Sequence, residues 1–267
     1  MFSKVSAEEI QEFLEENTWQ YFDELEELED LMDDEDCKFL ASDDMYIMTN
    51  PGDTIEVWAI PTKKDFDLAA FENWLNRYNE FRVHMNVSGL NPGSFRYQEY
   101  YEVSDEIKSY YAKGESDLTW ASEIEGTSLG AELQGSIRLL SAKDEKLARN
   151  FFQAETRGVM DLGQVFAFIV KDELGKILGY FDEEGKLVAY LSVMYGFNDV
   201  LVVDDLYVLS SRRKKGVASS LAKALISVAQ NENMDVYWPV AETELAQKTA
   251  KAAGYQEVAS RITIQNL

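Results

Sequence analysis

Residues 205–220 read DLYVLSSRRKKGVASS, and this stretch decides the fold prediction. It starts within the segment from Val200 to Leu209, whose Val, Leu and Tyr residues are typical of a strand. It ends in a segment from Val217 in which Leu221 and Leu225 recur at helical spacing. A strand and a helix are therefore predicted on either side of a short basic turn.

The turn holds four consecutive cations, Arg212 to Lys215, followed by Gly216. Unpaired N–H groups and the helix dipole favour an anion at a helix N-terminus, and glycine lets backbone approach a ligand closely. These residue types therefore suit a bound phosphate. An ordinary basic surface turn is the alternative interpretation.

The rest of the chain is acidic. Its 267 residues contain 25 Lys and Arg against 49 Asp and Glu, a formal net charge of −24. Such a surface repels nucleic acids and anionic membranes, and it attracts cationic partners. A single cysteine, Cys37, and a single histidine, His84, leave no disulfide and no His/Cys metal cluster. The longest apolar run, residues 165–170, is far too short to span a membrane, and no signal peptide is visible, so we expect a cytoplasmic protein without a metal.

The second half alternates strands and helices. Besides the strand and helix above, the pattern predicts strands at 137–140, 177–181, 187–194, 236–240 and 256–264, and helices at 142–152 and 244–253. Residues 165–171 are ambiguous between helix and strand. The sequence therefore predicts an α+β domain with a mixed, largely antiparallel sheet flanked by helices.

The first half has a similar texture. We predict a helix over 6–36 with Thr18 as an N-cap, strands at 39–48, 55–60, 82–87 and 95–103, and a helix at 67–78. Ten of the fourteen residues in 23–36 are acidic, which fits either a solvated helix face or a docking surface for a basic partner. Gly, Ser and Thr gather in 113–135, so the predicted domains are 1–130 and 131–267.

Three segments, taken in order, resemble one family. RKKGVA at 213–218 fits the (Arg/Gln)-x-x-Gly-x-(Gly/Ala) pyrophosphate loop of the Gcn-related N-acetyltransferase (GNAT) superfamily. DLYVL at 205–209 resembles the central strand of that superfamily, and AAGYQEV at 252–258 resembles its late helix–Gly–aromatic–strand signature. The resemblance covers about 130 residues from Ile137 to the end.

The resemblance implies that acetyl-CoA, or another acyl-CoA, is a co-substrate and that its acyl group passes directly to an amine. The pyrophosphate would lie on the loop amides and the pantetheine along the strand, with the Val208 N–H facing the oxyanion. The implied cofactor-binding residues are Tyr207, Val208, Leu209, Arg213, Lys214, Lys215, Gly216, Val217, Ala218, Ser219 and Thr243.

Two positions depart from the family pattern. Ala250 stands where a tyrosine commonly protonates the leaving thiolate, and Thr243 stands where an asparagine often contacts the cofactor. Any of Tyr195, Tyr237 and Tyr255 is an alternative acid, and a thiol of pKa about 8.5 also leaves as a thiolate without help.

A general base must take the ammonium proton of the acceptor. Asp204, Asp205 and Glu242 are the candidates, because they lie on or beside the strands that would flank the thioester. Successive residues of a regular strand face opposite sides, so at most one of Asp204 and Asp205 is expected to reach the cleft. Strand-edge or capping carboxylates are the alternative interpretation.

The first half resembles a degenerate repeat of the second. At an offset of 150, residues 57–60 fall on 207–210, and the apolar stripe of 71–78 falls on that of 221–228. The turn 61–67 then has Phe66 in the place of Gly216, and it carries Asp65 and Asp67 where phosphate would lie. An unrelated α+β domain is the alternative.

Two functions follow as hypotheses. The first is an N-acetyltransferase whose acceptor is a small amine or a basic peptide, because an acidic surface concentrates cations. The second is a non-catalytic module that keeps CoA binding, or only the fold, and acts through protein interactions. The oligomeric state is left open.

Overall fold

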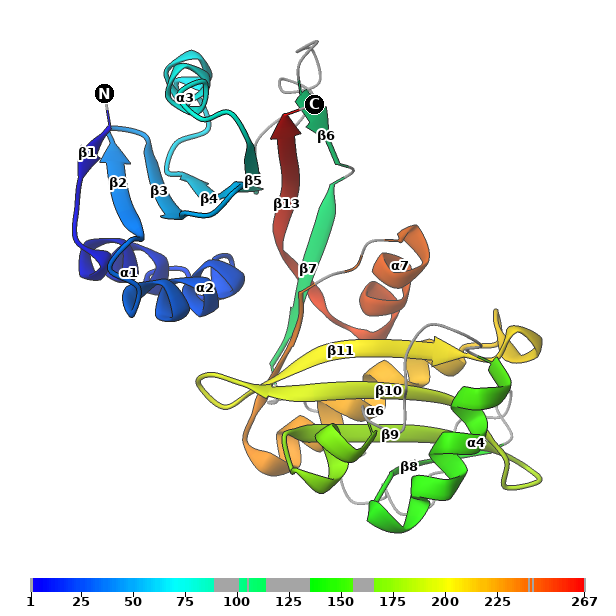
Figure 1. Cartoon of the computed structure of the whole chain (residues 1–267). Coiled ribbons are helices and arrows are strands. Elements are labelled where there is room, and N and C mark those ends of the chain that lie inside the picture. Colours follow the sequence, from blue (N-terminus) through cyan, green and yellow to red (C-terminus); the bar gives the residue numbers. More distant parts are fainter. Residues whose placement is uncertain are drawn as a thin grey trace. The chain divides into compact units, whose positions relative to one another are not determined.

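The computed structural model describes residues 2–88, 101–104, 106–113, 135–155, 166–239, 241 and 243–266 (Figure 1). The chain divides into two compact units, unit 1 (Met1–Ser109 with Val258–Leu267) and unit 2 (Tyr110–Glu257). Each unit combines a sheet with helices, which confirms the predicted α+β class. The boundary expected between residues 130 and 131 lies outside the described residues.

Unit 1 is built on a sheet with the strand order β1-β2-β3-β4-β5-β13. Its strands are β1 (Ser3–Lys4), β2 (Lys38–Ser42), β3 (Met45–Asn50), β4 (Ile55–Pro61), β5 (Phe81–Asn86) and β13 (Gln256–Asn266), with the short β6 (Tyr101–Val103) beside β13. Neighbouring strands are antiparallel except β4 and β5, which are parallel. The buried side chains of Ile47, Val57 and Val83 form part of its core.

Helices cover both faces of this sheet (Figure 1). They are α1 (Ala7–Glu15), α2 (Phe22–Met32) and α3 (Leu68–Leu75). The single helix expected over 6–36 is therefore wrong, and so is the expected cap. Thr18 donates its hydroxyl to the Glu15 carbonyl at the end of α1, whereas Ser6 caps the start of α1. The strand expected over 39–48 is likewise two strands, because the polar residues after Ser42 turn the chain back on itself.

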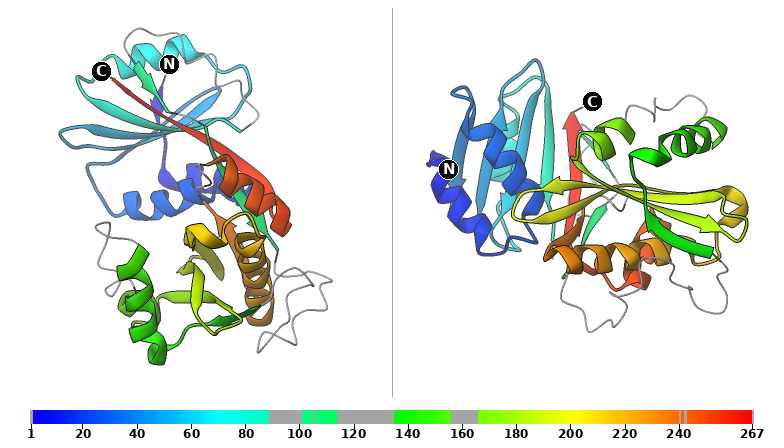
Figure 2. Two further views of the ribbon diagram at one scale, coloured as in Figure 1. Left: turned by 90° about the vertical axis from the view of Figure 1, so that its right-hand side faces the viewer. Right: turned by 90° about the horizontal axis from the view of Figure 1, so that it is seen from below.

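Unit 2 has the strand order β7-β12-β11-β10-β9-β8. Its strands are β7 (Ile107–Ala112), β8 (Gly135–Leu139), β9 (Gly175–Asp182), β10 (Leu187–Gly196), β11 (Val200–Val208) and β12 (Asp235–Trp238). Its helices are η2 (Ala142–Asp144), α4 (Glu145–Glu155), η3 (Ala167–Lys171), η4 (Ser210–Arg212), α6 (Val217–Glu232) and α7 (Glu244–Ala253). Figure 2 shows α4 on one face of the β8–β11 strands and α6 on the other. The ambiguous segment before Asp172 is helical where it is described.

The two halves share one topology. Each half begins with four neighbouring antiparallel strands, β1 to β4 in the first and β8 to β11 in the second. A helix then leads to a fifth strand that is parallel to the fourth, so that β5 pairs with β4 and β12 pairs with β11. The edge strand of each sheet comes from the other half of the chain: β13, at the C-terminal end, pairs with β5, and β7, from the first half, pairs with β12. A cut before Gly135 would separate both of these pairs.

A buried ion pair ties β13 to α2 inside unit 1. The guanidinium of Arg261 donates to both carboxylate oxygens of Glu24, at 2.9 and 2.7 Å, and to Asp23 and the Ser109 hydroxyl at 2.6 and 2.8 Å. The Glu24 side chain is only 5% exposed, so its charge depends on Arg261 for compensation.

We therefore expect Arg261→Met to lower the free energy of unfolding by about 3–5 kcal/mol, because it leaves Glu24 buried without its cation. Adding Glu24→Leu should recover most of that loss. Arg82→Met is the matched control, since its pair with Glu56 is exposed and worth about 1 kcal/mol or less. Urea unfolding of the four proteins, followed by circular dichroism, measures this; an Arg261→Met variant as stable as the control would contradict it.

Candidate functional site

A cavity of about 550 Å³ opens in unit 2 beside the second half of β11. Its walls come from β11, the following basic turn, the first turn of α6, the end of β12 and the start of α7. The lining residues are Val203, Asp204, Asp205, Leu206, Tyr207, Val208, Arg212, Arg213, Lys214, Gly216, Val217, Ala218, Ser219, Trp238, Thr243, Leu245, Ala246 and Thr249.

The cavity exists because two parallel strands part. Pairing between β11 and β12 covers three residue pairs and ends at Val202 and Tyr237. β11 continues to Val208, while β12 ends at Trp238. Backbone groups of 203–208 that face away from β10 therefore lie toward the cavity rather than toward β12, and a ligand can use them as a strand would.

The Val208 amide points into this opening. The Leu209 N–H donates to the Val188 carbonyl of β10 at 3.0 Å, so these two residues form a hydrogen-bonded pair. The next pair along the ladder is Val208 with Ala189. Because hydrogen-bonded and non-hydrogen-bonded pairs alternate in an antiparallel ladder, Val208 turns its backbone groups away from β10. Its carbonyl accepts from Arg213 Nε at 2.9 Å on that side.

The first turn of α6 is prepared for an anion. Its N-cap is Gly216, with φ of 79° and no side-chain cap, and Lys214 also has a positive φ of 61°. Backbone in alternating right- and left-handed conformations forms a concave nest of N–H groups. The amides that follow Gly216 are therefore left for a ligand, and Ser219 turns its hydroxyl back to the Gly216 carbonyl.

The four cations of the turn have different roles. Arg212 pairs with Asp182 at 2.9 Å, and Arg213 lies 5.5 Å from the centre of the Tyr207 ring. Lys214 and Lys215 are exposed, and within the described residues neither forms an ion pair. Half of the positive charge is thus engaged in holding the turn, and half is available to solvent or ligand.

A β-bulge places both aspartates in the cavity wall. Ser192 pairs with Asp205 and Val193 with Val203, so Asp204 is an extra residue in β11. The expectation that at most one of Asp204 and Asp205 reaches the cleft is wrong for this reason: both line the cavity, and both are exposed.

Ser192 and Tyr190 of β10 hold the bulge. The buried Ser192 hydroxyl donates to the Asp204 carboxylate at 2.9 Å and accepts from the Asp205 N–H at 3.1 Å. The Tyr190 hydroxyl donates to the Asp205 carboxylate in a short hydrogen bond. Burial, and then this carboxylate, raise the pKa of Tyr190, so the phenol stays protonated.

Most of the predicted cofactor residues meet at this cavity. Tyr207, Val208, Arg213, Lys214, Gly216, Val217, Ala218, Ser219 and Thr243 line it. Thr243 does so while its hydroxyl caps α7 by accepting from the Ala246 N–H at 3.1 Å. Lys215 and Leu209 are not among the lining residues, and Leu209 faces a second cavity instead. Glu242 lies outside the described residues.

None of the three substitute tyrosines lines the cavity. Tyr255 is buried, donates to the Ala222 carbonyl at 3.1 Å, and has a pKa raised by burial. Tyr237 is fully buried, and Tyr195 lies by Lys176 at the far end of β10. Ala250 is also fully buried, so a tyrosine there would overpack the core. The alternative acids are thus absent from the lining of this described cavity.

Sequence reasoning missed Ser192, Tyr190 and Thr249. Their relation to the site depends on the register of β10 with β11 and on the side of α7 that faces the cavity. A polar Ser192 inside an otherwise apolar strand was the one available signal. In the described parts of the chain, no group of His, Cys, Asp and Glu is placed to hold a metal ion, and no helix is long and apolar enough to cross a membrane.

Comparisons with known proteins agree with this arrangement. Residues 142–255 match the model of the acetyltransferase (GNAT) family. A GCN5-related N-acetyltransferase from Sphaerobacter thermophilus is 12% identical and has a TM-score of 0.59, and the match covers 99% of this chain and 94% of the other. A GNAT-family acetyltransferase from Colwellia psychrerythraea is 12% identical and has a TM-score of 0.53, and the match covers 100% of this chain and 99% of the other. These structures show a shared fold, and no curated protein matches the sequence significantly.

The bulge geometry generates a prediction about stability. Ser192→Ala should lower the free energy of unfolding by about 1 kcal/mol, because it removes the hydroxyl that accepts from the Asp205 N–H and donates to the Asp204 carboxylate. In a double-mutant cycle with Asp204→Ala, we expect a coupling of about 1 kcal/mol, since the two side chains are bonded. The cycle with Asp205→Ala is the control and should be additive, because Ser192 binds the backbone there. Equal coupling in both cycles, measured by urea unfolding, would contradict the described geometry.

Proposed function

Because residues 142–255 form a domain of the acetyltransferase (GNAT) family, we propose that this chain transfers an acetyl group from acetyl-CoA to an amine. The observation that carries the proposal is the cavity beside β11. It joins the part of β11 that is not paired with β12, a concave set of amides and two exposed carboxylates in one place. Each of these suits a different part of such a reaction.

The residues of the turn and of β11 fit acetyl-CoA. The uncapped amides after Gly216, with Lys214 and Lys215 nearby, suit the pyrophosphate. The edge of β11 suits the amides of the pantetheine arm, once Arg213 releases the Val208 carbonyl. Leu245, which is 65% exposed at the cavity wall, offers apolar contact.

Acetyl-CoA supplies its acetyl group as a thioester, which an amine attacks directly. Asp204 or Asp205, or Glu242 beyond the described residues, takes the proton of the incoming ammonium group. The Val208 N–H donates to the carbonyl oxygen as negative charge develops there. A C–N bond forms, the C–S bond breaks, and CoA departs as a thiolate, which a thiol pKa of about 8.5 permits near neutral pH. The nitrogen of the new amide then gives up its remaining extra proton to the thiolate or to solvent.

The acceptor is a small amine or a basic peptide. Two exposed carboxylates in the wall favour a cationic group there, and the net charge of −24 raises the local concentration of cations. A cytoplasmic location, and no role in binding nucleic acids or membranes, agree with this charge.

A second function is a CoA-binding module without catalysis. It is favoured by one observation, namely that Ala250 is buried and that Tyr195, Tyr237 and Tyr255 all lie away from the cavity lining. A screen of amines and basic peptides with acetyl-CoA, following release of free thiol, separates the two functions. Acceptor-dependent release supports the enzyme, and CoA binding without release supports the module.

The phosphate nest predicts how one glycine affects binding. Acetyl-CoA should raise the melting temperature of the intact chain, because a ligand that binds only the folded state stabilises it. Gly216→Glu should abolish that shift by adding a side chain and a negative charge to the nest. Gly185→Glu is the matched control: it has the same charge change and a similar φ of 72°, lies in the β9–β10 turn, and should keep the shift. A full shift in Gly216→Glu would remove the turn from the site.

The carboxylates predict a pH dependence. With a general base and no required acid, kcat should rise through one ionisation and then stay level at high pH. Asn or Gln in place of the base should lower kcat about 10²–10⁴-fold near neutral pH, and the rate should recover once the pH exceeds the amine pKa. Single amide variants at Asp204, Asp205 and Glu242, each assayed across pH, identify the base. A falling alkaline limb that disappears with one Tyr→Phe change would show that an acid is required instead.

A further inference from the structure

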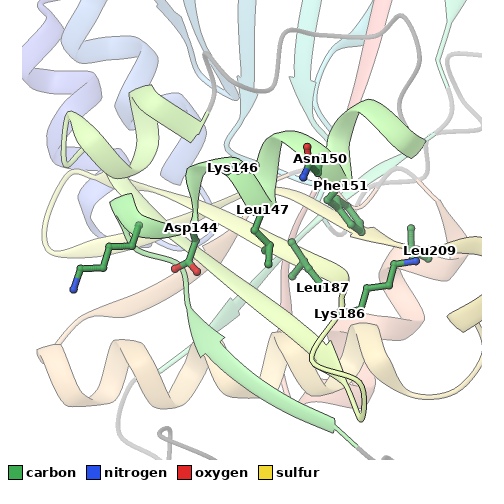
Figure 3. A pocket seen from close by; sticks show the side chains of 9 residues that line it. Asp144, Lys146, Leu147, Asn150, Phe151, Lys186, Leu187 and Leu209 are labelled. Atoms are coloured by element: carbon green, nitrogen blue, oxygen red, sulfur yellow. The ribbon is translucent and has the colours of Figure 1, made fainter.

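A second cavity, of about 510 Å³, lies in unit 2 between α4 and the turn of the β9–β10 hairpin (Figure 3). Leu147 and Phe151 of α4 face Leu187 of the hairpin across it, and Leu209 lies at one side. Its volume is within the range of small-molecule sites, and the facing side chains make an apolar interior. No residue that lines this cavity also lines the cavity beside β11.

Positive charge surrounds this apolar interior. Lys143, Lys146 and Lys186 line the cavity, with Asp144 as the one acidic lining residue. Asp144 forms an ion pair with Arg138 instead of with these lysines: its two carboxylate oxygens accept from Arg138 at 2.8 and 2.9 Å. Arg138 lowers the pKa of Asp144 to about 2, so this pair stays ionised and neutral overall.

The three lysines have no such partner in the part of the chain that the structure describes. Within the described residues none of their ammonium groups forms an ion pair. In a chain with 49 acidic and 25 basic residues, three uncompensated lysines around one apolar cavity stand out from the surrounding charge. Long-range repulsion keeps anions from this protein, so only a site with such local charge can hold one.

We infer that this cavity binds an amphipathic organic anion, with its apolar body against Leu147, Phe151 and Leu187 and its acidic head at the lysines. Burial of the apolar body supplies most of the affinity, and the lysines select a negative head over a neutral or positive one. The site is separate from the proposed acetyl-CoA site, because the two cavities share no lining residue.

The probe for this inference is 8-anilinonaphthalene-1-sulfonate, which joins aromatic rings to one sulfonate. Its fluorescence on titration with the full chain gives a dissociation constant at low salt. Lys146→Glu and Lys186→Glu should each weaken binding about tenfold, because each reverses a charge beside the sulfonate. Lys223→Glu is the matched control: this exposed lysine of α6 lines neither cavity, and its variant should bind the probe within twofold of the parent chain.

Three further measurements locate the probe. The uncharged analogue N-phenyl-1-naphthylamine should bind the parent chain and the lysine variants equally, since it lacks the group that the lysines recognise. Leu147→Trp should weaken both probes by filling the cavity. Gly216→Glu should bind both like the parent chain, whatever it does to acetyl-CoA, so this test is independent of the proposed function.

Three results would overturn the inference. The first is unchanged sulfonate binding in Lys146→Glu and Lys186→Glu. The second is an equal loss in Lys223→Glu, which would indicate overall charge rather than a site. The third is competitive displacement of the sulfonate by CoA, which would make the cavity a part of the cofactor site. Far-ultraviolet circular dichroism that matches the parent chain shows that each variant is folded.

Discussion

The early separation of β11 from β12 is the constraint on which the proposed site depends. Three residue pairs hold the strands together, and among the described residues β12 does not continue beside β11 beyond Val202. Backbone N–H and C=O groups that do not face a strand need other partners, so this edge suits a ligand with an extended amide-bearing chain. The Gly216 turn at the end of β11 then places the amides of α6 at the same opening.

The first half shows the same topology without this separation. β4 and β5 pair over five residues, through Trp58 with His84 and Ala59 with Met85, so the strands stay together where β11 and β12 part. The rings of Trp58 and His84 stack at 5.5 Å over this continued ladder. The fold is kept, and the opening between its parallel strands is closed.

The helix after β4 is also closed to an anion. Asp67 caps α3 by accepting from the Ala70 N–H at 3.0 Å, and its own N–H donates to Asp44 at 2.7 Å. A carboxylate of the protein thus satisfies the helix N-terminus that α6 leaves open at Gly216. The prediction that the first half lacks a cofactor loop was made from Phe66, Asp65 and Asp67, and these contacts agree with it. The degenerate repeat is consistent with them.

Sequence patterns predicted the features that depend on neighbouring residues. The strand–turn–helix around Gly216 and the limits of α7 were predicted from local spacing, and both are present. The bulge at Asp204 was not predicted, because it depends on the register between β10 and β11. The contact between Asp205 and Tyr190 follows from the same register and was not predicted either. The exchanged strands could not be predicted from the sequence either. The strands β13 and β5 pair although they are far apart in the chain, and no local sequence pattern specifies that pairing.

The central claim is that one of the two related halves has an acyl-CoA site and the other does not. Calorimetric titration of the intact chain with acetyl-CoA tests this most directly, because it counts sites without requiring an acceptor. The account predicts one site per chain, with an affinity that falls as salt screens Lys214 and Lys215. Two sites per chain, or no binding at any salt concentration, would contradict it.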